Sequence, residues 1–244
     1  MDIYGLIGFP LGHSFSRKFF MEKFAKEHIE AEYRNFEIAD VRQLPDIVRN
    51  TPNLRGLNCT IPHKQSILPL LDELDERAHR IGAVNVVKVM KDGRLKGYNA
   101  DVIGFRDSIR PLILPYHRHA LLLGTGGASL AVRAGLEELG LTCTYVSRTS
   151  RKGALTYEEL TPEVMRKHQV IVNCSPVGMY PHIDEAPALP YELLTPNHLL
   201  YDLVYNPLQT AFMQRGEAYG AVTKNGLEML HLQALASWDI WNQE

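Results

Sequence analysis

The sequence predicts an α/β protein made of two α/β domains. Short strand-like runs alternate with helical patterns along most of the chain, which is typical of βαβ units covering a largely parallel sheet. The 244 residues, 45% of them hydrophobic, suit two modest cores better than one large core. A glycine-rich segment, Gly124–Ala128, directly follows the apolar run Ala120–Leu123, as expected where a strand turns into a helix.

The first half of the chain begins with a strand over Ile3–Ile7, which ends in a turn rich in glycine and proline. The next segment carries three phenylalanines on one helical face, and Ser14 or Ser16 can cap the start of that helix. We expect further strands at Glu32–Ile38 and Gly56–Thr60, with a helix between them around Val41–Val48.

A β-hairpin is expected at the end of the first half. Two strand-like runs, Asn85–Met90 and Leu95–Asn99, are separated by a short polar segment. That segment contains Asp92-Gly93, which supplies the positive backbone angles of a tight turn. The hairpin therefore closes the first series of elements.

A second α/β series starts near His119. A strand over Ala120–Leu123 is followed by the glycine-rich turn and a helix that runs through Leu139. The last segment, Leu227–Trp241, has apolar residues at helical spacing, and we expect this helix to return to the first domain. Further strands are expected at Thr142–Val146, Val170–Asn173, Leu199–Val204 and Ala221–Val222.

Composition narrows the class of protein. The formal net charge of -2 lacks the basic excess of a nucleic-acid binder. The three cysteines are odd in number and lack metal-ligand spacing, so we expect buried thiols in a reducing compartment and no metal. There is no apolar run of membrane-spanning length and no charged leader, which predicts a soluble, cytoplasmic protein without membrane partners. Monomer and homodimer both remain open.

The glycine-rich turn is a shortened dinucleotide-binding motif. Gly124, Gly126 and Gly127 permit a tight turn and close backbone approach to a pyrophosphate, with a helix N-terminus behind it. A glycine-rich turn without a ligand is the alternative interpretation.

The segment after the next strand indicates which dinucleotide binds. An NAD enzyme would place an acidic residue there, about twenty residues further on, but this chain has Ser147-Arg148-Thr149-Ser150-Arg151-Lys152. A guanidinium matches a 2′-phosphate, so the segment favours NADP over NAD as cofactor. A solvated basic loop is the alternative.

Two residues suggest acid–base chemistry. Lys64 follows Pro62 at the start of a helical run, where a lysine opposes the helix dipole and gains no obvious stability. Asp101 lies at the start of a helix expected from Val102, where it can act as a cap. An acid–base pair beside a dinucleotide site is typical of a dehydrogenase, whereas each residue alone has an ordinary surface explanation.

The chain resembles the shikimate dehydrogenase family over nearly its whole length. Many motifs occur in the family's order, which makes a chance match negligible. They are Gly8–Ser16, Asn58–Lys64, Gly82–Asn85, Gly97–Gly104, the glycine-rich turn, Ser147–Thr149, Asn173–Met179, Tyr201–Pro207 and Asn225–Leu227.

This resemblance implies an N-terminal substrate-binding domain, residues 1–100 plus 226–244, and a Rossmann-like NADP-binding domain, residues 101–225. It implies NADP-dependent reduction of 3-dehydroshikimate to shikimate in the shikimate pathway, with Lys64 and Asp101 as catalytic residues. The implied substrate-binding residues are Ser14, Ser16, Asn58, Thr60, Asn85, Tyr205 and Gln233. The implied cofactor-binding residues are Gly124, Gly126, Gly127, Ala128, Ser147, Arg148, Thr149, Arg151, Met179 and Gly226, with Lys152 a further candidate for the 2′-phosphate.

The chain departs from the family pattern at four positions: Arg17, Ala100, Ser147 and Glu228. Arg17 and Glu228 bear on substrate preference more than on reaction class. Two rival interpretations remain, an NAD-using quinate/shikimate dehydrogenase and a non-catalytic shikimate-binding relative. Ser147-Arg148 argues against the first, and retention of both Lys64 and Asp101 argues against the second.

Overall fold

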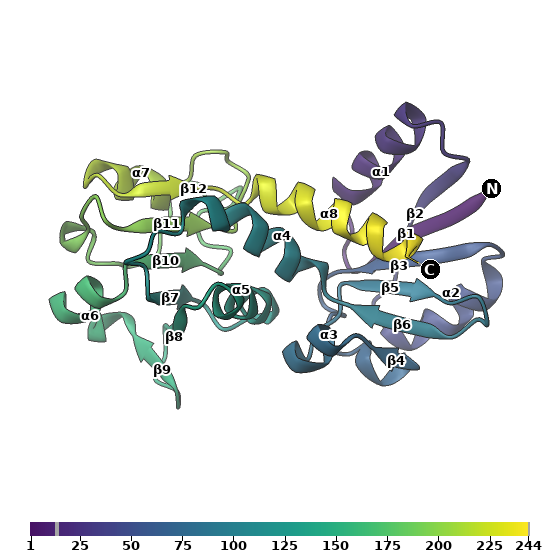
Figure 1. Cartoon of the computed structure of the whole chain (residues 1–244), viewed down its shortest axis with the longest axis horizontal. Helices are drawn as coiled ribbons and strands as arrows, with labels where there is room; N and C mark the ends of the chain where they lie inside the picture. The colour runs from purple at the N-terminus through teal and green to yellow at the C-terminus, as the bar shows by residue number, and fades with distance from the viewer. Residues whose placement is uncertain (13–14, 244) are drawn as a thin grey trace. The chain divides into compact units, whose positions relative to one another are not determined.

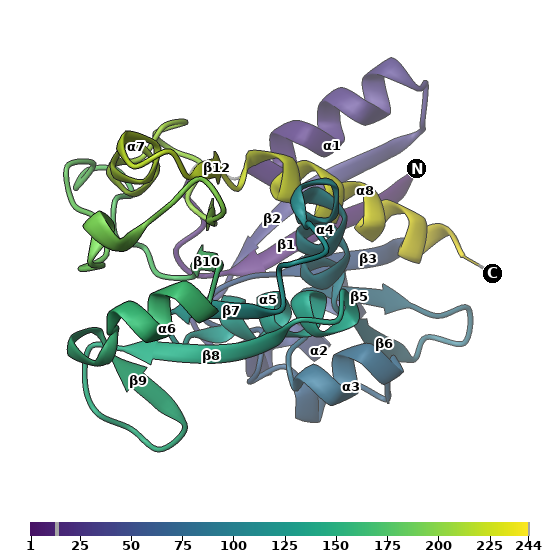
Figure 2. The same cartoon turned by 60° about the vertical axis from the view of Figure 1, so that its left-hand side comes forward.

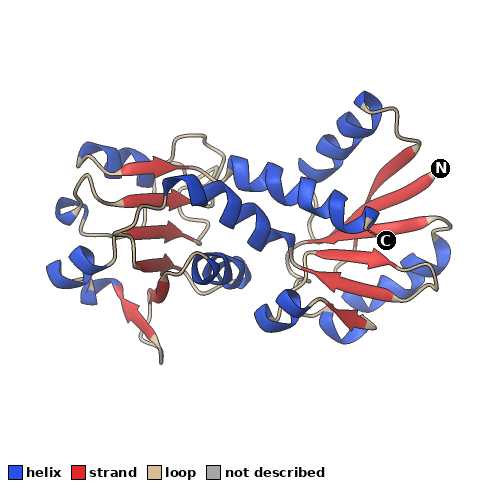
Figure 3. Cartoon of the chain, in the orientation of Figure 1, coloured by secondary structure: helices blue, strands red, loops and turns tan. Residues whose placement is uncertain are grey.

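The computed structural model describes residues 1–12 and 15–243. The chain divides into two compact units, Met1–Ala100 with Ala234–Glu244, and Asp101–Gln233. Each unit contains one six-stranded sheet with helices on it, which confirms the expected α/β class (Figures 1 and 3). The boundary at which the chain returns to the first unit lies between Gln233 and Ala234, inside the last helix. The sequence suggested that this boundary lies between residues 225 and 226.

The first unit is built on a mixed sheet with the strand order β2-β1-β3-β5-β6-β4. Parallel pairing joins β1 to β2 and β3, and antiparallel pairing joins β3 to β5 and β5 to β6, which confirms the expected hairpin. The strands are β1 (Asp2–Gly8), β2 (Ala31–Glu37), β3 (Leu54–Cys59), β4 (Glu73–Leu74), β5 (Val86–Val89) and β6 (Leu95–Tyr98).

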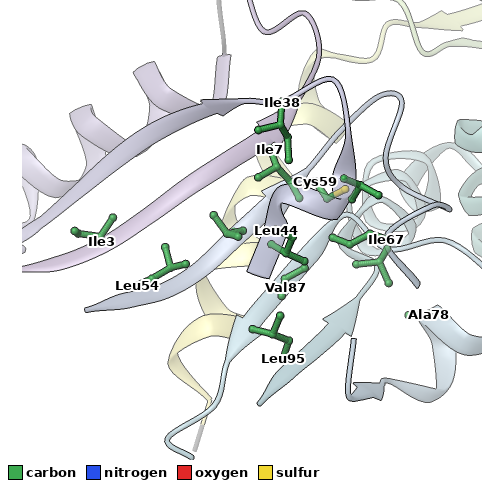
Figure 4. Close-up of a cluster of buried hydrophobic side chains, with 13 residues drawn as sticks. Ile3, Ile7, Ile38, Leu44, Leu54, Cys59, Ile67, Ala78, Val87 and Leu95 are labelled. Carbon is green, nitrogen blue, oxygen red and sulfur yellow. The ribbon is translucent and has the colours of Figure 1, made fainter. Parts of the chain in front are cut away.

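Helices cover both faces of this sheet. The core on one face packs Ile7 and Val87 from the strands against Leu44 of α2 (Leu44–Asn50), as Figure 4 shows. On the other face, the ring of Tyr4 lies against rings from α1 (Phe15–Lys26) and from the last helix. A short helix, α3 (Glu76–Ile81), begins at an Asp75 cap. Because β1 is buried along both faces, it is apolar on almost every residue.

The last helix, α8 (Leu227–Asn242), packs its C-terminal half on the first unit, as the sequence predicted. The indole Nε1 of Trp241 donates to the carbonyl oxygen of Val87 over 3.1 Å. This close approach needs a glycine in the neighbouring strand, because a Cβ on Gly56 would overlap the Trp241 indole. Trp241 of α8 can therefore pack here only because Gly56 of β3 has no side chain.

The second unit is a parallel sheet with the strand order β12-β11-β10-β7-β8-β9. The order runs outward from β7 in both directions, as in the 3-2-1-4-5-6 order of the Rossmann fold, so the expected Rossmann-like unit is confirmed. Figure 2 shows β7 and β8 side by side. The strands are β7 (His119–Leu123), β8 (Thr142–Ser147), β9 (Ala154–Thr156), β10 (Val170–Asn173), β11 (Leu199–Asp202) and β12 (Val222–Lys224).

Two hydrophobic clusters lie on opposite faces of the second sheet, one containing Leu121 and Ile171, the other Leu122 and Val172. The central strands are buried on both faces, which is why they are continuous apolar runs in the sequence. The helices of this unit include α4 (Ala100–Ile109), α5 (Gly127–Glu138), α6 (Pro162–Lys167) and α7 (Ala211–Ala218).

Two capping expectations are wrong. Ser16 lies inside the first turn of α1, which begins at Phe15, so it does not cap that helix. Asp101 likewise lies inside α4, which begins at Ala100. Both errors come from helices that start one or two residues earlier than the periodicity suggested. Ser14, the other candidate cap, lies outside the described residues.

The three cysteines are free thiols, as expected. Cys59 is buried, whereas Cys143 and Cys174 are half-buried, so the expectation of full burial is correct for Cys59 alone. Burial also raises the pKa of the Cys143 thiol to about 12, so this sulfur stays protonated near neutral pH. Among the described residues, no helix is both long enough and apolar enough to cross a membrane.

Gly56→Ala should destabilise the protein by about 1 to 3 kcal/mol, because the added methyl group overlaps the Trp241 indole. Urea unfolding measures the loss. Gly126→Ala is a control for the overlap, since a Cβ at Gly126 meets no atom within 4 Å, and it should cost less than Gly56→Ala even though Gly126 is the N-cap of α5. In a Trp241→Ala background the Gly56 effect should largely disappear, and full additivity of the two changes would contradict this explanation.

Candidate functional site

The loop that carries Lys64 is held by backbone and side-chain hydrogen bonds within the first unit. Thr60 N donates to the carbonyl oxygen of Ile7 over 2.9 Å, where the loop leaves β3. His63 is only 3% exposed, and its Nε2 lies 2.7 Å from the carbonyl oxygen of Ile38. The carbonyl oxygen of Lys64 accepts from Val84 N at 2.8 Å. The position of Lys64 is therefore fixed by its main chain, and its side chain is half-buried.

Asn85 connects the lysine loop to the start of α4. Its carbonyl oxygen accepts from Cys59 N at 2.8 Å, and its N–H donates to Tyr98 O over 3.0 Å. Its side-chain Oδ1 accepts from Ala100 N at 2.7 Å. This bond satisfies one of the N–H groups that a helix start leaves without an intrahelical partner. Asn85 therefore supplies a side-chain acceptor at this helix start.

Asp101 follows in the first turn of α4 and is 8% exposed. A carboxylate in the first turn interacts favourably with the helix dipole, so its position is compatible with the stability of the helix.

Asn58, at the end of β3, belongs to a buried polar network. Its side chain is 5% exposed, and its Oδ1 accepts from the Tyr33 hydroxyl at 2.7 Å. Its Nδ2 donates to Ser237 Oγ over 2.9 Å. Burial raises the pKa of the Tyr33 hydroxyl well above its usual value, while a hydrogen bond with the Ser16 side chain acts in the opposite direction. The network thus joins two sequence-predicted residues, Ser16 and Asn58, through Tyr33.

Sequence reasoning missed Tyr33 and Ser237. Tyr33 lies in the middle of β2, where an aromatic residue is ordinary core material. Ser237 lies inside α8 and belongs to no motif. The one usable signal is chemical, because a buried tyrosine or serine needs a hydrogen-bond partner, whereas phenylalanine or alanine would not.

Of the remaining predicted substrate residues, Thr60 is half-buried in the first unit, directly before the lysine loop. The other two lie in the second unit. Gln233 Nε2 donates to Leu230 O over 2.9 Å, and its backbone passes close to α4, where a Cβ on Gly104 would be 2.8 Å from Gln233 N. Tyr205, after β11, is 40% exposed.

The glycine-rich turn of the second unit has the geometry of an anion-binding loop. Gly124 has φ of 116°, which favours glycine, and follows β7. Gly126 is the N-cap of α5, and a Cβ added at Gly126 or Gly127 would meet no atom within 4 Å. The backbone is therefore open to a ligand at a helix N-terminus. It lies at the switch point between β7 and β10, where dinucleotides bind in this fold.

The end of β8 lies next to this turn because β7 and β8 pair in parallel. Arg151 Nη1 donates to Thr125 Oγ1 over 2.7 Å, which holds its guanidinium beside the glycine-rich turn. Arg148 and Thr149 are exposed, and Thr149 N donates to Ser147 Oγ over 3.4 Å. Lys152 is exposed as well. These groups fit a phosphate better than they fit a neutral ribose.

Three further predicted cofactor residues lie in the second unit. Ala128 is in the first turn of α5, and Met179 is exposed in a turn closed by Met179 N and the carbonyl oxygen of Pro176 at 3.1 Å. Gly226 precedes α8, and a Cβ there would overlap the carbonyl oxygen of Leu203, so the position requires glycine. No group of three His, Cys, Asp or Glu side chains in the described part of the chain could hold a metal ion.

A buried carboxylate stabilises the loop after β11. Asp202 accepts from Thr210 Oγ1 at 2.6 Å, from Asn173 Nδ2 at 2.9 Å and from Val204 N at 3.0 Å. Burial raises the pKa of the Asp202 carboxyl to about 6, although these hydrogen bonds oppose the shift. Asp202 is thus a structural acid that joins the ends of β10 and β11.

Comparison with known proteins agrees with this geometry. A family model described as the shikimate dehydrogenase substrate binding domain matches residues 6–87. A relative from Methanococcus maripaludis, named shikimate dehydrogenase (NADP(+)), is 37% identical over 98% of this chain and 91% of its own length. The chain belongs to the shikimate dehydrogenase family.

Solved structures of similar proteins include enzymes with different ligands. A shikimate 5-dehydrogenase from Thermus thermophilus, in complex with NADP(H) and shikimate, is 31% identical, with a TM-score of 0.86 over 99% of this chain and 94% of the other. A quinate dehydrogenase from Corynebacterium glutamicum, in complex with NAD, is 25% identical, with a TM-score of 0.87 over 99% of this chain and 93% of the other. The shikimate dehydrogenase fold therefore occurs with both cofactors.

Asp202→Asn should change how stability depends on pH. The folded-state pKa of about 6 lies above the ordinary value of 3.8, so the folded protein binds the proton more tightly than the unfolded chain. The free energy of unfolding of the parent should therefore fall as pH rises from about 4 to about 6, by up to about 3 kcal/mol from this group. Asparagine removes this contribution.

Urea unfolding between pH 4 and pH 7 measures the effect. Relative to the parent, Asp202→Asn should become more stable as pH rises. Asp46→Asn, at an exposed position on α2, serves as the control. A constant difference between parent and Asp202→Asn across the range would contradict the raised pKa.

Proposed function

We propose that this protein catalyses the reversible, NADP-dependent reduction of 3-dehydroshikimate to shikimate. The observation that supports this most directly is the full-length similarity, over 99% of the chain, to an enzyme crystallised with NADP(H) and shikimate. The ordered lysine loop and the Rossmann strand order are consistent with it.

In this proposal the bound cofactor supplies a hydride to the substrate ketone, and side chains of the protein supply the proton. Lys64, whose loop is held by His63 and Val84, donates a hydrogen bond and then the proton to the oxygen that becomes negative. Asp101 is the second member of the acid–base pair.

Ser14 and Ser16 are proposed to bind the substrate carboxylate, and Asn58, Thr60 and Asn85 its ring hydroxyls. These neutral side chains can orient a polyhydroxylated ring without the cost of burying further charges. Tyr205 and Gln233 of the second unit are proposed as additional substrate contacts.

The glycine-rich turn, Gly124–Ala128, is proposed to hold the pyrophosphate of NADP at the N-terminus of α5. Arg148 and Arg151 are proposed to bind the 2′-phosphate, with Ser147 and Thr149 adding hydroxyl donors. Lys152 is an alternative cation for the same group. Met179 and Gly226 are proposed as further cofactor contacts.

An NAD-using quinate or shikimate dehydrogenase is the second candidate, supported by similarity to the quinate dehydrogenase described above. Ser147-Arg148 counts against it, since NAD enzymes favour an acidic residue there. Following cofactor reduction with shikimate or quinate, each with NADP or NAD, separates these activities. A protein that binds shikimate but reduces neither cofactor would instead be the non-catalytic relative. We further propose a cytoplasmic location and a monomeric or homodimeric state.

Lys64→Ala should lower kcat for shikimate oxidation about a hundredfold or more, as expected for loss of a general acid–base group. Circular dichroism and NADP affinity should be nearly unchanged, because the loop's hydrogen bond with Val84 comes from the main chain of Lys64. Lys91→Ala, in an exposed turn, is the matched control and should keep the parent rate. A Lys64→Ala rate within a few-fold of the parent would remove Lys64 from the mechanism.

Cofactor choice gives a second test. Two charge-assisted hydrogen bonds to the 2′-phosphate contribute roughly 3 to 6 kcal/mol before the entropy of two long side chains is subtracted, so the parent should prefer NADP by about two orders of magnitude. The double variant Ser147→Asp with Arg148→Ala should reverse the preference, because a carboxylate repels the phosphate and accepts from the ribose hydroxyls. Values of kcat/KM for both cofactors measure this. Equal use of NAD and NADP by the parent would refute the assignment.

A further inference from the structure

The hydroxyl of Tyr33 is not needed for packing. The side chain is 1% exposed, and its ring stacks on that of Phe20 with a centroid distance of 4.8 Å and an interplanar angle of 10°. Phenylalanine would keep this stacking without placing a hydroxyl in the core. The reason for a tyrosine must therefore be found in the groups that its hydroxyl contacts.

The main contact is Asn58, and its geometry sets the orientation of the Asn58 amide. The Tyr33 hydroxyl has one proton and gives it to Asn58 Oδ1 over 2.7 Å. The opposite end of the amide, Nδ2, donates to Ser237 Oγ over 2.9 Å. If the amide rotated by 180°, Oδ1 would face the carbonyl oxygen of Asn85, which can only accept, so that orientation is disfavoured. Tyr33 supports the other orientation by donating to Oδ1.

The same contacts determine what Asn58 can offer a ligand. Nδ2 has two hydrogens, and besides Ser237 it reaches the carbonyl oxygen of Asn85 at 3.4 Å. Oδ1 has two lone pairs and uses one for Tyr33. After these contacts, the Asn58 side chain has one unused hydrogen-bonding position, the second lone pair of Oδ1. Asn58 held in this way accepts a hydrogen bond from a hydroxyl more readily than it donates one to a carboxylate.

We propose that Tyr33 is a positioning residue, which together with Ser237 holds the Asn58 amide so that Oδ1 accepts a hydrogen bond from a ring hydroxyl of the substrate. This inference rests on the proposed function, because it requires the hydroxylated substrate to bind beside Asn58. It adds a role for two buried side chains that belong to none of the sequence motifs.

The test is Tyr33→Phe, which removes one oxygen atom and keeps the ring. Its KM for shikimate should rise about tenfold, the loss expected for one neutral hydrogen bond, while its KM for NADP stays within about twofold. Tyr201→Phe is the matched control, because Tyr201 is also buried and its hydroxyl lies 2.6 Å from Ser108 Oγ in the second unit. The control should lose stability but keep the parent KM for shikimate.

A double-mutant cycle distinguishes positioning from a general structural effect. In an Asn58→Ala background, Tyr33→Phe should raise the shikimate KM no further, because the amide that it orients is gone. Ser237→Ala removes the acceptor of Asn58 Nδ2 and should also raise the KM for shikimate. This variant tests the same proposal if Tyr33→Phe does not fold.

An active parent whose Tyr33→Phe and Ser237→Ala variants keep the parent KM for shikimate would overturn the positioning role alone. A full effect of Tyr33→Phe in the Asn58→Ala background would overturn it as well. A parent that oxidises no shikimate would reject the proposed function and, with it, this inference.

Discussion

The hydrogen bond from Ala100 N to Asn85 Oδ1 is the constraint on which the first unit's site depends. The backbone of Asn85 is hydrogen-bonded to Cys59 of β3 and to Tyr98 of β6. These bonds fix the residue whose side chain accepts from the helix. The helix start is thereby tied to the strands, and the lysine loop is tied to the residue just before Asn85 through Val84 N and Lys64 O. If this one side-chain acceptor is lost, a buried N–H is left without its partner at the beginning of α4.

Much of the fold could be predicted from the sequence because the central strands are buried on both faces. The sequence predicts β10 with the bounds that the structure has, and β7, β8 and α8 within two residues. The elements that it does not predict are short. β4 and β9 have two and three residues, α3 and α6 have six each and α7 has eight, too few for hydrophobic periodicity to stand out. Their positions are set by tertiary contacts and caps such as Asp75 and Thr161.

The candidate site was less accessible from the sequence than the fold. Residues in motifs, such as Asn58 and Lys64, could be found by resemblance, but the groups that orient them could not. Tyr33 is an aromatic residue in a strand and Ser237 a small residue in a helix, and both are ordinary at such positions. A one-dimensional pattern reports which side chains are apolar, whereas hydrogen-bond partners 25 and 179 residues apart are decided only when the chain folds.

The proposed substrate residues and the proposed cofactor residues differ in the kind of interaction that they can make with a ligand. Around Asn58 the partners are hydroxyls and amides in a buried network, while at the end of β8 they are guanidinium groups in contact with solvent. Exposed ion pairs weaken as the Debye length shortens from about 10 Å at 0.1 M salt to about 3 Å at 1 M, whereas neutral buried hydrogen bonds are far less affected. Ionic strength therefore acts on the two halves of this protein unequally, so that a salty medium would weaken nucleotide capture well before it disturbed recognition of the ring.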